Sequence, residues 1–400
     1  MAEFVGIGLG AVQAGLYLAR AEAAEMGRAV ILRRHEQADC IRRAGFIDVN
    51  VAAAESLQWK RIHRVEPLLV TDPACVNHLA AATEIAVAVN SVGDYAGIAP
   101  LLAAATRRKS RQGLPPCIIY ASENHLAAAH LLRAAIEAED GVPDRFQTVD
   151  TVIGKMSKTI KGEDEITAAG LRRCCPGLSE AWLVEAYDEL HIGRIADTGT
   201  YVQRLPGVTM HDDLQPMAAA KLYGHNAAHA TFAYAGLALN LPLIRDVVAL
   251  DSIMQLVRQA MLEETGVALR QRFGNGNPLF SGKGWTDYTD SLFNRMANPN
   301  LGDSCERVGR DAVRKLGWHD RLIGTIRFVE EAGVPAHSWK IAACCACHAS
   351  DWNTRRLAAK WRLDGATPEA ADNMSLALEQ CRPHCRRWLR SAFQFPAPKL

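Results

Sequence analysis

Short apolar runs alternate with helical patterns along the first half of the chain. Apolar runs of four or five residues occupy 4–7, 29–32, 85–89 and 117–121, and helical periodicity covers 13–25, 98–106 and 124–137. Such alternation is typical of βαβ units, in which parallel strands carry helices on both faces of a sheet. Strand-like residues at 181–192 predict an extension of the sheet. The first half is therefore predicted to be an α/β domain.

The pattern becomes wholly helical after Pro206. Asp212, Asp213 and Pro216 form the capping and first-turn signal of a helix. Helical patterns then follow at 245–272, 288–296, 305–315, 320–332 and 339–348, and glycine-rich residues 273–287 predict a long loop. We expect an all-α C-terminal domain and a boundary near 195–205, which gives a first domain at 1–200 and a helical substrate-binding domain at 201–400.

Composition excludes several classes of partner. The chain has 400 residues, 45 basic and 44 acidic, with a formal net charge of +1. This balance argues against a nucleic-acid partner or an anionic membrane surface. The most apolar stretch, 227–244, is interrupted by His229, Asn240 and Pro242, so we expect a buried helix there rather than a membrane span.

The start of the chain and its cysteines predict a compartment. The first expected strand begins almost at the initiator methionine, so we expect no signal peptide. Eleven cysteines, an odd number, suit a reduced cytosol better than a disulfide framework. We therefore expect a cytoplasmic protein, and a monomer.

Glycines mark the turn from the first strand into the first helix. Glycine there lets the backbone turn tightly and approach a pyrophosphate, which the helix N-terminus favours. One register uses Gly6 and Gly8, and the other uses Gly8 and Gly10, with Gln13 in place of the third glycine. We prefer the second, because it leaves residues 4–7 as strand. It predicts a Rossmann-type dinucleotide-binding domain with the cofactor on Gly8, Gly10, Ala11, Val12 and Gln13.

The end of the second strand bears on the choice of cofactor. A NAD site normally carries an acidic residue there for the ribose 2′-hydroxyl. This chain has Arg33 and Arg34, followed by His35 and Glu36. Two arginines suit a 2′-phosphate and favour NADP. Glu36 could instead bind the ribose of NAD, so NAD also remains possible. The other interpretation is that both arginines are merely exposed.

Lys221, Asn226 and His229 fall within one short helical segment. Steps of five and three residues, at about 100° each, place the three within an arc of roughly 140°. One helix face could then carry a base and its partners for acid/base chemistry. The alternative is a solvated or capping cluster with no chemistry.

The order of the segments resembles a known family. The glycine turn, Ser122-Glu123-Asn124 after a strand, the Lys-x4-Asn-x2-His pattern and the run 306–316 with Asp320-Arg321-Leu322 occur in this order. Together they resemble the polyol-specific long-chain dehydrogenases, the mannitol dehydrogenase family, and the last segment is most similar to the mannitol-1-phosphate 5-dehydrogenases. The resemblance is weakest in 36–80 and beyond 345.

The resemblance implies roles for these residues. It makes Lys221 the general acid/base, without a metal, and burial would lower its pKa towards neutrality. It implies that Asn226 and Asn124 hold the alkoxide and that His229 positions the substrate. For Asn124 the other reading is helix capping. Some members have a glutamate where this chain has Ala218, so that proton relay is missing or built differently. Cofactor-edge residues by the same resemblance are Ser91, Val92, Gly93 and Glu123.

A basic segment predicts the charge of the substrate. Arginine and lysine exceed acidic residues between 306 and 321, and forked guanidiniums fit phosphate or carboxylate oxygens. With the family resemblance, this predicts a hexitol phosphate and a ketohexose phosphate of the mannitol 1-phosphate and fructose 6-phosphate type. The expected contacts are Arg310, Arg314 and Lys315. The alternatives are a hexuronate, a free polyol, a salt-bridged helix face, or a non-enzymatic nucleotide-binding regulator.

Cysteines and histidines gather near the C-terminus. They are Cys344, Cys345, Cys347, His348, Cys381, His384 and Cys385. Their spacing is poor for a structural zinc site, which usually offers paired Cys-x2–4-Cys elements. We expect no metal and read these cysteines as small buried apolar residues, with zinc the minor alternative.

Overall fold

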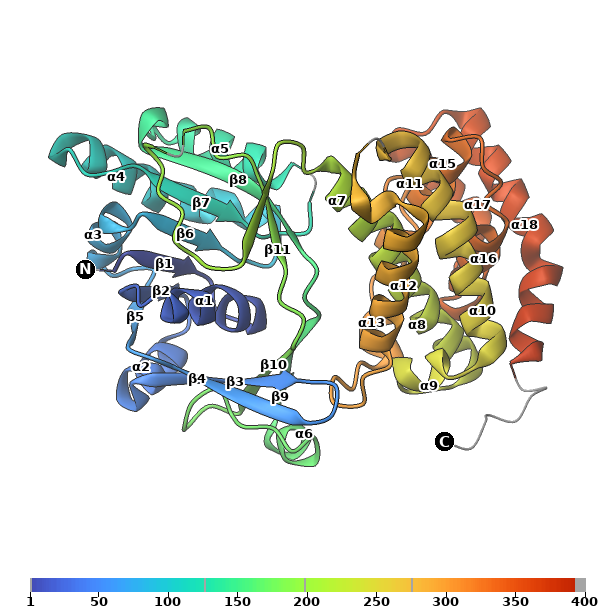
Figure 1. Ribbon diagram of the computed structural model, residues 1–400, viewed down its shortest axis with the longest axis horizontal. Coiled ribbons are helices and arrows are strands. Elements are labelled where there is room, and N and C mark those ends of the chain that lie inside the picture. Colours follow the sequence, from blue (N-terminus) through green and yellow to red (C-terminus); the bar gives the residue numbers. More distant parts are fainter. Residues whose placement is uncertain (1, 126, 198, 275, 393–400) are drawn as a thin grey trace. The chain divides into compact units, whose positions relative to one another are not determined.

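The computed structural model describes residues 2–125, 127–197, 199–274 and 276–392. Two compact units make up the chain, Met1–Gln215 and Pro216–Leu400, and both appear in Figure 1. Each is described by itself below. In the described ranges, no helix is both long and apolar enough to cross a membrane.

The first unit is built on an eight-stranded sheet with the strand order β12-β11-β8-β7-β6-β1-β2-β5. All neighbours pair in parallel except β8 and β11. A smaller sheet has the order β4-β3-β10-β9. The bounds are β1 Phe4–Ile7, β2 Arg28–Leu32, β3 Phe46–Ala52, β4 Leu57–His63, β5 Val65–Leu69, β6 Glu84–Val87, β7 Cys117–Ala121, β8 Phe146–Ile153, β9 Ser157–Lys161, β10 Glu180–Glu185, β11 Leu190–Gly193 and β12 Val208–His211.

The predicted α/β class of this unit is confirmed, and so are its four apolar strands. β1 and β7 have the predicted limits, and β2 and β6 differ from them by one or two residues. The segment 181–192 is not a single extension of the main sheet. Its first part, β10, joins the smaller sheet, and only β11 continues the main one.

Helices cover both faces of the main sheet. One face packs on α3, α4 and α5, and the other on the first helix and α2 (Figure 1). The predicted helix at 124–137 begins later, at Ala128. The helical bounds are η1 Gln13–Leu18, α1 Ala19–Ala23, α2 His35–Ala44, α3 Ala74–Ala81, η2 Val92–Asp94, α4 Tyr95–Gln112, α5 Ala128–Ala138, η3 Pro143–Arg145 and α6 Glu163–Ala168.

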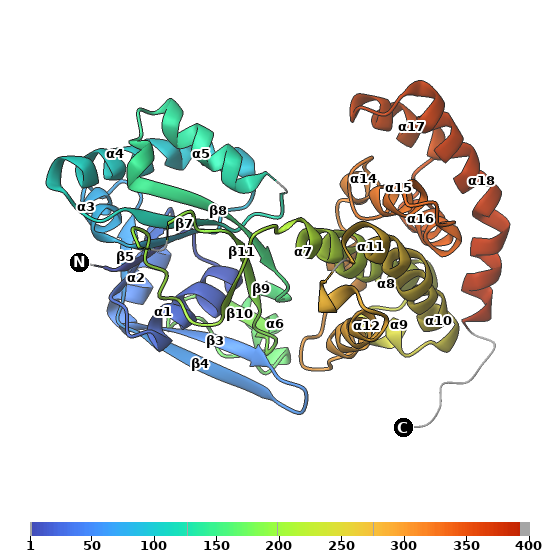
Figure 2. The same cartoon turned by 45° about the horizontal axis from the view of Figure 1, so that its top comes forward.

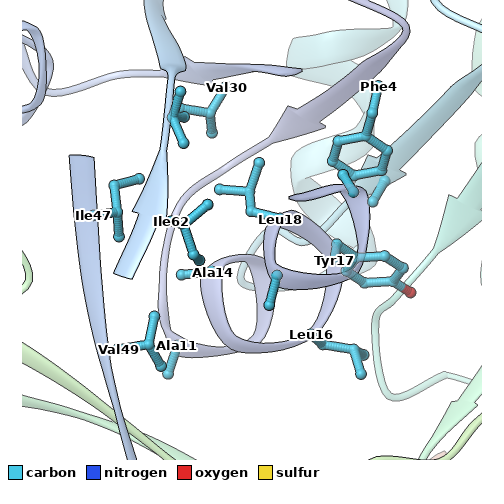
Figure 3. Packing of buried hydrophobic residues seen from close by; sticks show 14 of the residues in the cluster. Phe4, Ala11, Ala14, Leu16, Tyr17, Leu18, Val30, Ile47, Val49 and Ile62 are labelled. Atoms are coloured by element: carbon cyan, nitrogen blue, oxygen red, sulfur yellow. The ribbon is translucent and has the colours of Figure 1, made fainter. Parts of the chain in front are cut away.

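The first helix lies between the two sheets. Figure 3 shows Ala14 and Leu18 of this helix beside Ile47 and Ile62 of the smaller sheet, all members of one buried cluster. Gly15 makes the close approach possible, because a Cβ there would lie 2.5 Å from the side chain of Val184 in β10. The smaller sheet therefore fixes the helix that begins at the glycine turn.

The division between the units lies beyond the expected boundary near 195–205. β12 pairs in parallel with β11, so the sheet continues to His211. Asp213 then accepts a hydrogen bond from the backbone of Gln215, where α7 (Gln215–Ala219) begins. The helix-start signal was read correctly, but the short edge strand before it was missed.

In the described part of the second unit every regular element is a helix, as predicted. Its centre is α8, which is buried on all sides and contacts α9, α10, α13 and α16, and Figure 2 shows α18 along its outer edge. The expected buried helix at 227–244 is thus confirmed as α8. The bounds are η4 Ala220–Asn226, α8 Ala227–Leu239, α9 Ile244–Val248, α10 Asp251–Gln259, η5 Ala260–Thr265, α11 Gly266–Phe273, η6 Pro278–Phe280, α12 Gly282–Met296, α13 Cys305–Gly309, α14 Ala312–Lys315, α15 Ile323–Glu331, α16 His337–Ala349, α17 Thr354–Leu363 and α18 Pro368–Ser391.

Two predictions for this unit need correction. The loop expected at 273–287 is shorter, because the Ser281 side chain caps α12, which begins at Gly282. The helix expected at 305–315 is interrupted, because Asp311 adopts a left-handed conformation with φ of 59° and separates α13 from α14. This interruption shapes the basic segment described below.

Candidate active site

The glycine turn leaves open space at the start of the first helix. Gly8 has φ of +82°, and a Cβ on it would collide with the carbonyl oxygen of Ala88. A Cβ on Gly10 would meet nothing within 4 Å, and the helix starts at Ala11, directly after it. The first N–H groups of a helix have no partner within the helix. This turn can therefore receive an anionic group such as a pyrophosphate.

Gln13 takes the place of the third glycine in the preferred register. Its side chain is fully buried and packs over Gly6, where a Cβ would collide with the Gln13 amide. Among the described residues, neither polar atom of this amide has a hydrogen-bond partner. Gln13 therefore lies beneath the strand-to-helix turn, and the adjoining Ala11 is buried while Val12 is half-buried.

The two arginines after β2 have different surroundings. Arg34 forms a forked pair with Glu180 of β10, with nitrogen–oxygen distances of 2.6 and 2.7 Å, and this hydrogen bonding raises its pKa. Arg33 is 60% exposed and lies 3.4 Å from the carboxylate of Asp94. The expectation that both arginines await a 2′-phosphate needs correction, because Glu180 already engages Arg34.

The expected cofactor-edge loop is a short, capped turn. Ser91 and Asp94 form a reciprocal capping box around Val92 and Gly93 in η2. Glu123, at the end of β7, accepts hydrogen bonds from the backbone of Val89, at 2.8 Å, and from the hydroxyl of Tyr95. Burial raises the pKa of Glu123. This carboxyl thus joins the ends of β6 and β7 to α4 and holds the loop in place.

Asn124 lies in the bend after β7 and is exposed. The capping reading for this residue is wrong, because α5 begins at Ala128 and no side chain caps it. An exposed amide at the carboxyl end of a parallel strand is well placed for ligand contact. The alternative to its proposed role as an oxyanion donor, helix capping, is therefore not seen at α5.

Lys221 lies in a π-helical segment of the second unit. η4 interrupts the continuous helix 215–239, and π segments are frequent at functional sites. The side chain is half-buried, yet burial lowers the pKa of Lys221 to about 8, with help from the nearby charge of Arg321. Within the described ranges its amine has no hydrogen-bond or ion-pair partner. The free amine can therefore exchange a proton near neutral pH.

The π segment also changes the spacing of the predicted face. Hydrogen bonds from residue i to i+5 bring residues five apart onto successive turns, which aligns Asn226 with Lys221 more closely than an α-helix would. Between them lies His225, which is buried and whose pKa is well below the usual value because of burial. The neutral amide of Asn226 and the amine of Lys221 thus occupy one side of the helix.

His229 is paired with a carboxylate that the sequence did not single out. Its Nε2 lies 3.1 Å from Oδ2 of Asp303, and Asp303 also pairs with Arg307, one turn into α13. Burial alone would raise the pKa of Asp303, but His229 and Arg307 lower it to about 2. Asp303 is therefore ionised at neutral pH.

The basic segment does not present its cations uniformly. The buried Lys315 amine donates to the carbonyl oxygens of Val308 and Arg310 at the end of α13. Arg314 pairs with Asp320 at 3.1 Å. Arg310 is exposed and donates, at 3.3 Å, to the carbonyl of Arg307. The prediction of Lys315 as a phosphate contact is therefore incorrect, and Arg310 differs from Arg314 in that its hydrogen bond goes to a backbone carbonyl and not to a carboxylate.

Arg321 is the cation that acts on the lysines. It binds the carboxylate of Asp320 at 2.8 Å and is 13% exposed. Its charge lowers the pKa of both Lys221 and Lys315. Arg321, in the segment Asp320-Arg321-Leu322, therefore affects the protonation of both lysines, which the number of basic residues in the sequence did not reveal.

The C-terminal cysteines line a cavity of about 280 Å³ between α16, α17 and α18. Cys344, Cys347 and Cys385 are buried there, and the pKa of each thiol is raised above its usual value. In the part of the chain that the structure describes, no three or more His, Cys, Asp or Glu side chains form a group that could hold a metal ion. The burial of Cys344, Cys347 and Cys385 agrees with their interpretation as small buried apolar residues.

Comparison with known proteins identifies the family. The family model of the mannitol dehydrogenase C-terminal domain matches residues 213–357. A mannitol-1-phosphate 5-dehydrogenase of Brevibacillus brevis is 27% identical over 75% of this chain and 78% of its own length. Another, of Paenarthrobacter aurescens, is 31% identical over 60% of this chain and 59% of its own. Residues 213–357 therefore match the C-terminal domain of the mannitol dehydrogenase family, and most of the chain is similar to mannitol-1-phosphate 5-dehydrogenases.

A solved structure supports the same fold. The Pseudomonas fluorescens mannitol 2-dehydrogenase, in a ternary complex with NAD and D-mannitol, matches with a TM-score of 0.74 at 12% identity, over 98% of this chain and 94% of its own. The resemblance to the mannitol dehydrogenase family and the fold inferred from the sequence are both confirmed.

Sequence reasoning missed Asp303, Glu180 and the particular influence of Arg321. Asp303 and Arg307 stand four residues apart, which is the spacing of a helical ion pair. That spacing was visible, but the partner His229 lies too far along the chain for a local pattern to connect them. Glu180 and Arg34 are likewise joined only through the smaller sheet.

Proposed function

We propose that this member of the mannitol dehydrogenase family interconverts a hexitol phosphate and a ketohexose phosphate, of the mannitol 1-phosphate and fructose 6-phosphate type. The observation that carries the proposal is the Lys221 amine in the family-matched segment, which has a pKa of about 8 and no partner among the residues that the structure describes. The relatives named mannitol-1-phosphate 5-dehydrogenases support the phosphate on the substrate.

A nicotinamide dinucleotide fits the residues of the glycine turn. The open space at Gly10 and the helix start at Ala11 would hold its pyrophosphate, and Ser91, Val92 and Gly93 would border it. When bound, this cofactor supplies hydride transfer to or from the substrate carbon. We propose that Arg33 alone decides on NADP, because Glu180 already neutralises Arg34.

Lys221 and the two asparagines provide the proton chemistry. In the oxidising direction the neutral Lys221 amine accepts the proton of the substrate hydroxyl at Nζ. In the reducing direction its ammonium form returns that proton to the carbonyl oxygen. Asn226 and Asn124 donate N–H groups to the developing alkoxide without adding a titratable charge. His229 orients the substrate through one of its hydroxyl groups.

Arg310 is the leading contact for the phosphate. It is exposed, and its guanidinium donates a hydrogen bond to a backbone carbonyl, which does not neutralise its charge. Arg314 can contribute only by sharing its guanidinium with Asp320. Charge-assisted hydrogen bonds to phosphate are typically worth about 1.5–3 kcal/mol, enough to discriminate a sugar phosphate from a free sugar.

A hexuronate is the second candidate substrate, because a carboxylate would bind the same guanidinium. A panel assay separates the possibilities: fructose 6-phosphate, fructose and a hexuronate are each tested with NADH and with NADPH. We expect turnover of fructose 6-phosphate far above that of fructose. Turnover of the hexuronate but not of fructose 6-phosphate would show that the substrate is a sugar acid. Cofactor binding without turnover of any polyol or sugar would favour the non-enzymatic nucleotide-binding regulator.

A further inference from the structure

His229 and Asp303 share one buried contact. His229 Nε2 and Asp303 Oδ2 lie 3.1 Å apart. Both atoms are shielded from solvent, and within the described ranges neither has a hydrogen-bond partner. A buried polar atom without a partner is costly, and a small rotation of the ring would let these two atoms satisfy each other.

The charge on Asp303 decides which atom carries the proton. Asp303 is 2% exposed and pairs with Arg307 through its other oxygen, Oδ1. A carboxylate held in the ionised form accepts hydrogen bonds and has none to donate. The hydrogen between the two side chains must therefore sit on His229 Nε2.

We infer that Asp303 is a positioning residue that fixes His229 as the Nε2–H tautomer and so makes Nδ1 the atom that accepts a hydrogen bond from a substrate hydroxyl. The His229 side chain is 15% exposed although its Nε2 is shielded, so Nδ1 is the ring nitrogen available to a ligand. In a neutral imidazole the nitrogen without hydrogen is an acceptor. The identity of the ligand at Nδ1 rests on the proposed function, whereas the tautomer of His229 does not depend on it.

Arg307 gives the arrangement its direction. Its guanidinium has only donors, so it holds the Oδ1 side of Asp303 and leaves Oδ2 facing the imidazole. In Asp303→Asn, Arg307 should retain the carbonyl oxygen of the new amide, and the amide nitrogen would then face His229. That nitrogen donates, so Nε2 would have to accept and the hydrogen would move to Nδ1.

The test is ¹⁵N NMR of the full chain labelled at histidine, with His229 assigned by its absence in His229→Gln. We expect the Nε2–H tautomer at pH 8 in the natural sequence and the Nδ1–H tautomer in Asp303→Asn. Asp290→Asn is the matched control, because it breaks another arginine–aspartate pair, with Arg258, and should leave the tautomer unchanged. An Nδ1–H tautomer in the natural sequence, or an unchanged one in Asp303→Asn, would overturn the inference.

Kinetics of the same variants test the effect on the substrate. Asp303→Asn should raise KM for the accepted polyol or sugar phosphate at least about tenfold, and by more than it lowers kcat, because the lost hydroxyl contact is already made in the ground state. Unchanged KM with an inverted tautomer would contradict the role of Nδ1. Failure of the natural chain to turn over any substrate would instead reject the proposed function and leave the NMR result to decide on Asp303.

Discussion

Two lysines in the second unit, the half-buried Lys221 and the buried Lys315, have similar pKa values and different surroundings. Burial and the charge of Arg321 lower the pKa of both Lys221 and Lys315 to about 8. The Lys315 amine donates hydrogen bonds to two backbone carbonyls at the end of α13. The Lys221 amine has no such partner among the described residues. The comparison shows that a lowered pKa alone does not mark a catalytic base; a free amine is also required.

The largest effect should come from Lys221→Ala. Removal of the proposed acid/base should reduce turnover by at least about 10²-fold, while cofactor still binds at the glycine turn. Steady-state kinetics measure the first quantity, and cofactor fluorescence titration measures the second. Near-normal turnover would move the role to another residue, with His229 the first to examine.

Lys315→Met should act on stability instead. The methionine keeps much of the side-chain volume but leaves the carbonyls of Val308 and Arg310 without their donor, which should cost about 1–3 kcal/mol. Urea unfolding at pH 7 measures the loss, and the kcat of the folded enzyme should fall less than about threefold. A 10²-fold fall in kcat with unchanged stability would erase the distinction between the two lysines.

Arg310→Ala should change substrate affinity and leave both lysines intact. The loss of one charge-assisted contact should raise KM for the sugar phosphate roughly tenfold. Arg355→Ala, which removes another exposed arginine of the same unit, on α17, is the matched control and should leave KM unchanged. If both variants behave alike, the basic segment is only a solvated helix face.

Arg33→Ala should have the smallest effect, limited to the cofactor. We expect the KM for NADPH to rise several-fold and that for NADH to change little, because the side chain is largely exposed and its pair with Asp94 is 3.4 Å long. Arg34→Ala should instead weaken the link to Glu180 and lower the thermal midpoint. An unchanged KM for NADPH in Arg33→Ala would reject the 2′-phosphate assignment.

Local patterns predicted what local patterns can specify. Apolar runs located β1 and β7 to the residue, and the Lys-x4-Asn-x2-His spacing located the acid/base segment. The smaller sheet was missed because β3 and β10 pair across more than a hundred residues. The π-helical geometry of η4 and the break at Asp311 also have no simple sequence signal.

Distant ion pairs explain the remaining differences at the candidate site. The sequence suggested that Arg34 was available for a phosphate, but in the structure it pairs with Glu180 of β10. The sequence likewise suggested only the substrate as a partner of His229, whereas the structure places Asp303 beside it. In each case the residue type was identified correctly and its partner was not. The sequence can identify a cationic or imidazole side chain, but only the fold shows which residue it pairs with.

The pH dependence of turnover tests the central claim about Lys221 most directly. Because the neutral amine is the base for oxidation, kcat/KM for the polyol should rise as pH increases through about 8, and for reduction it should fall over the same range, since the ammonium is then the acid. Lys315→Met should retain this transition, and Lys221→Ala should lose it. A transition that survives in Lys221→Ala, or disappears in Lys315→Met, would contradict the account.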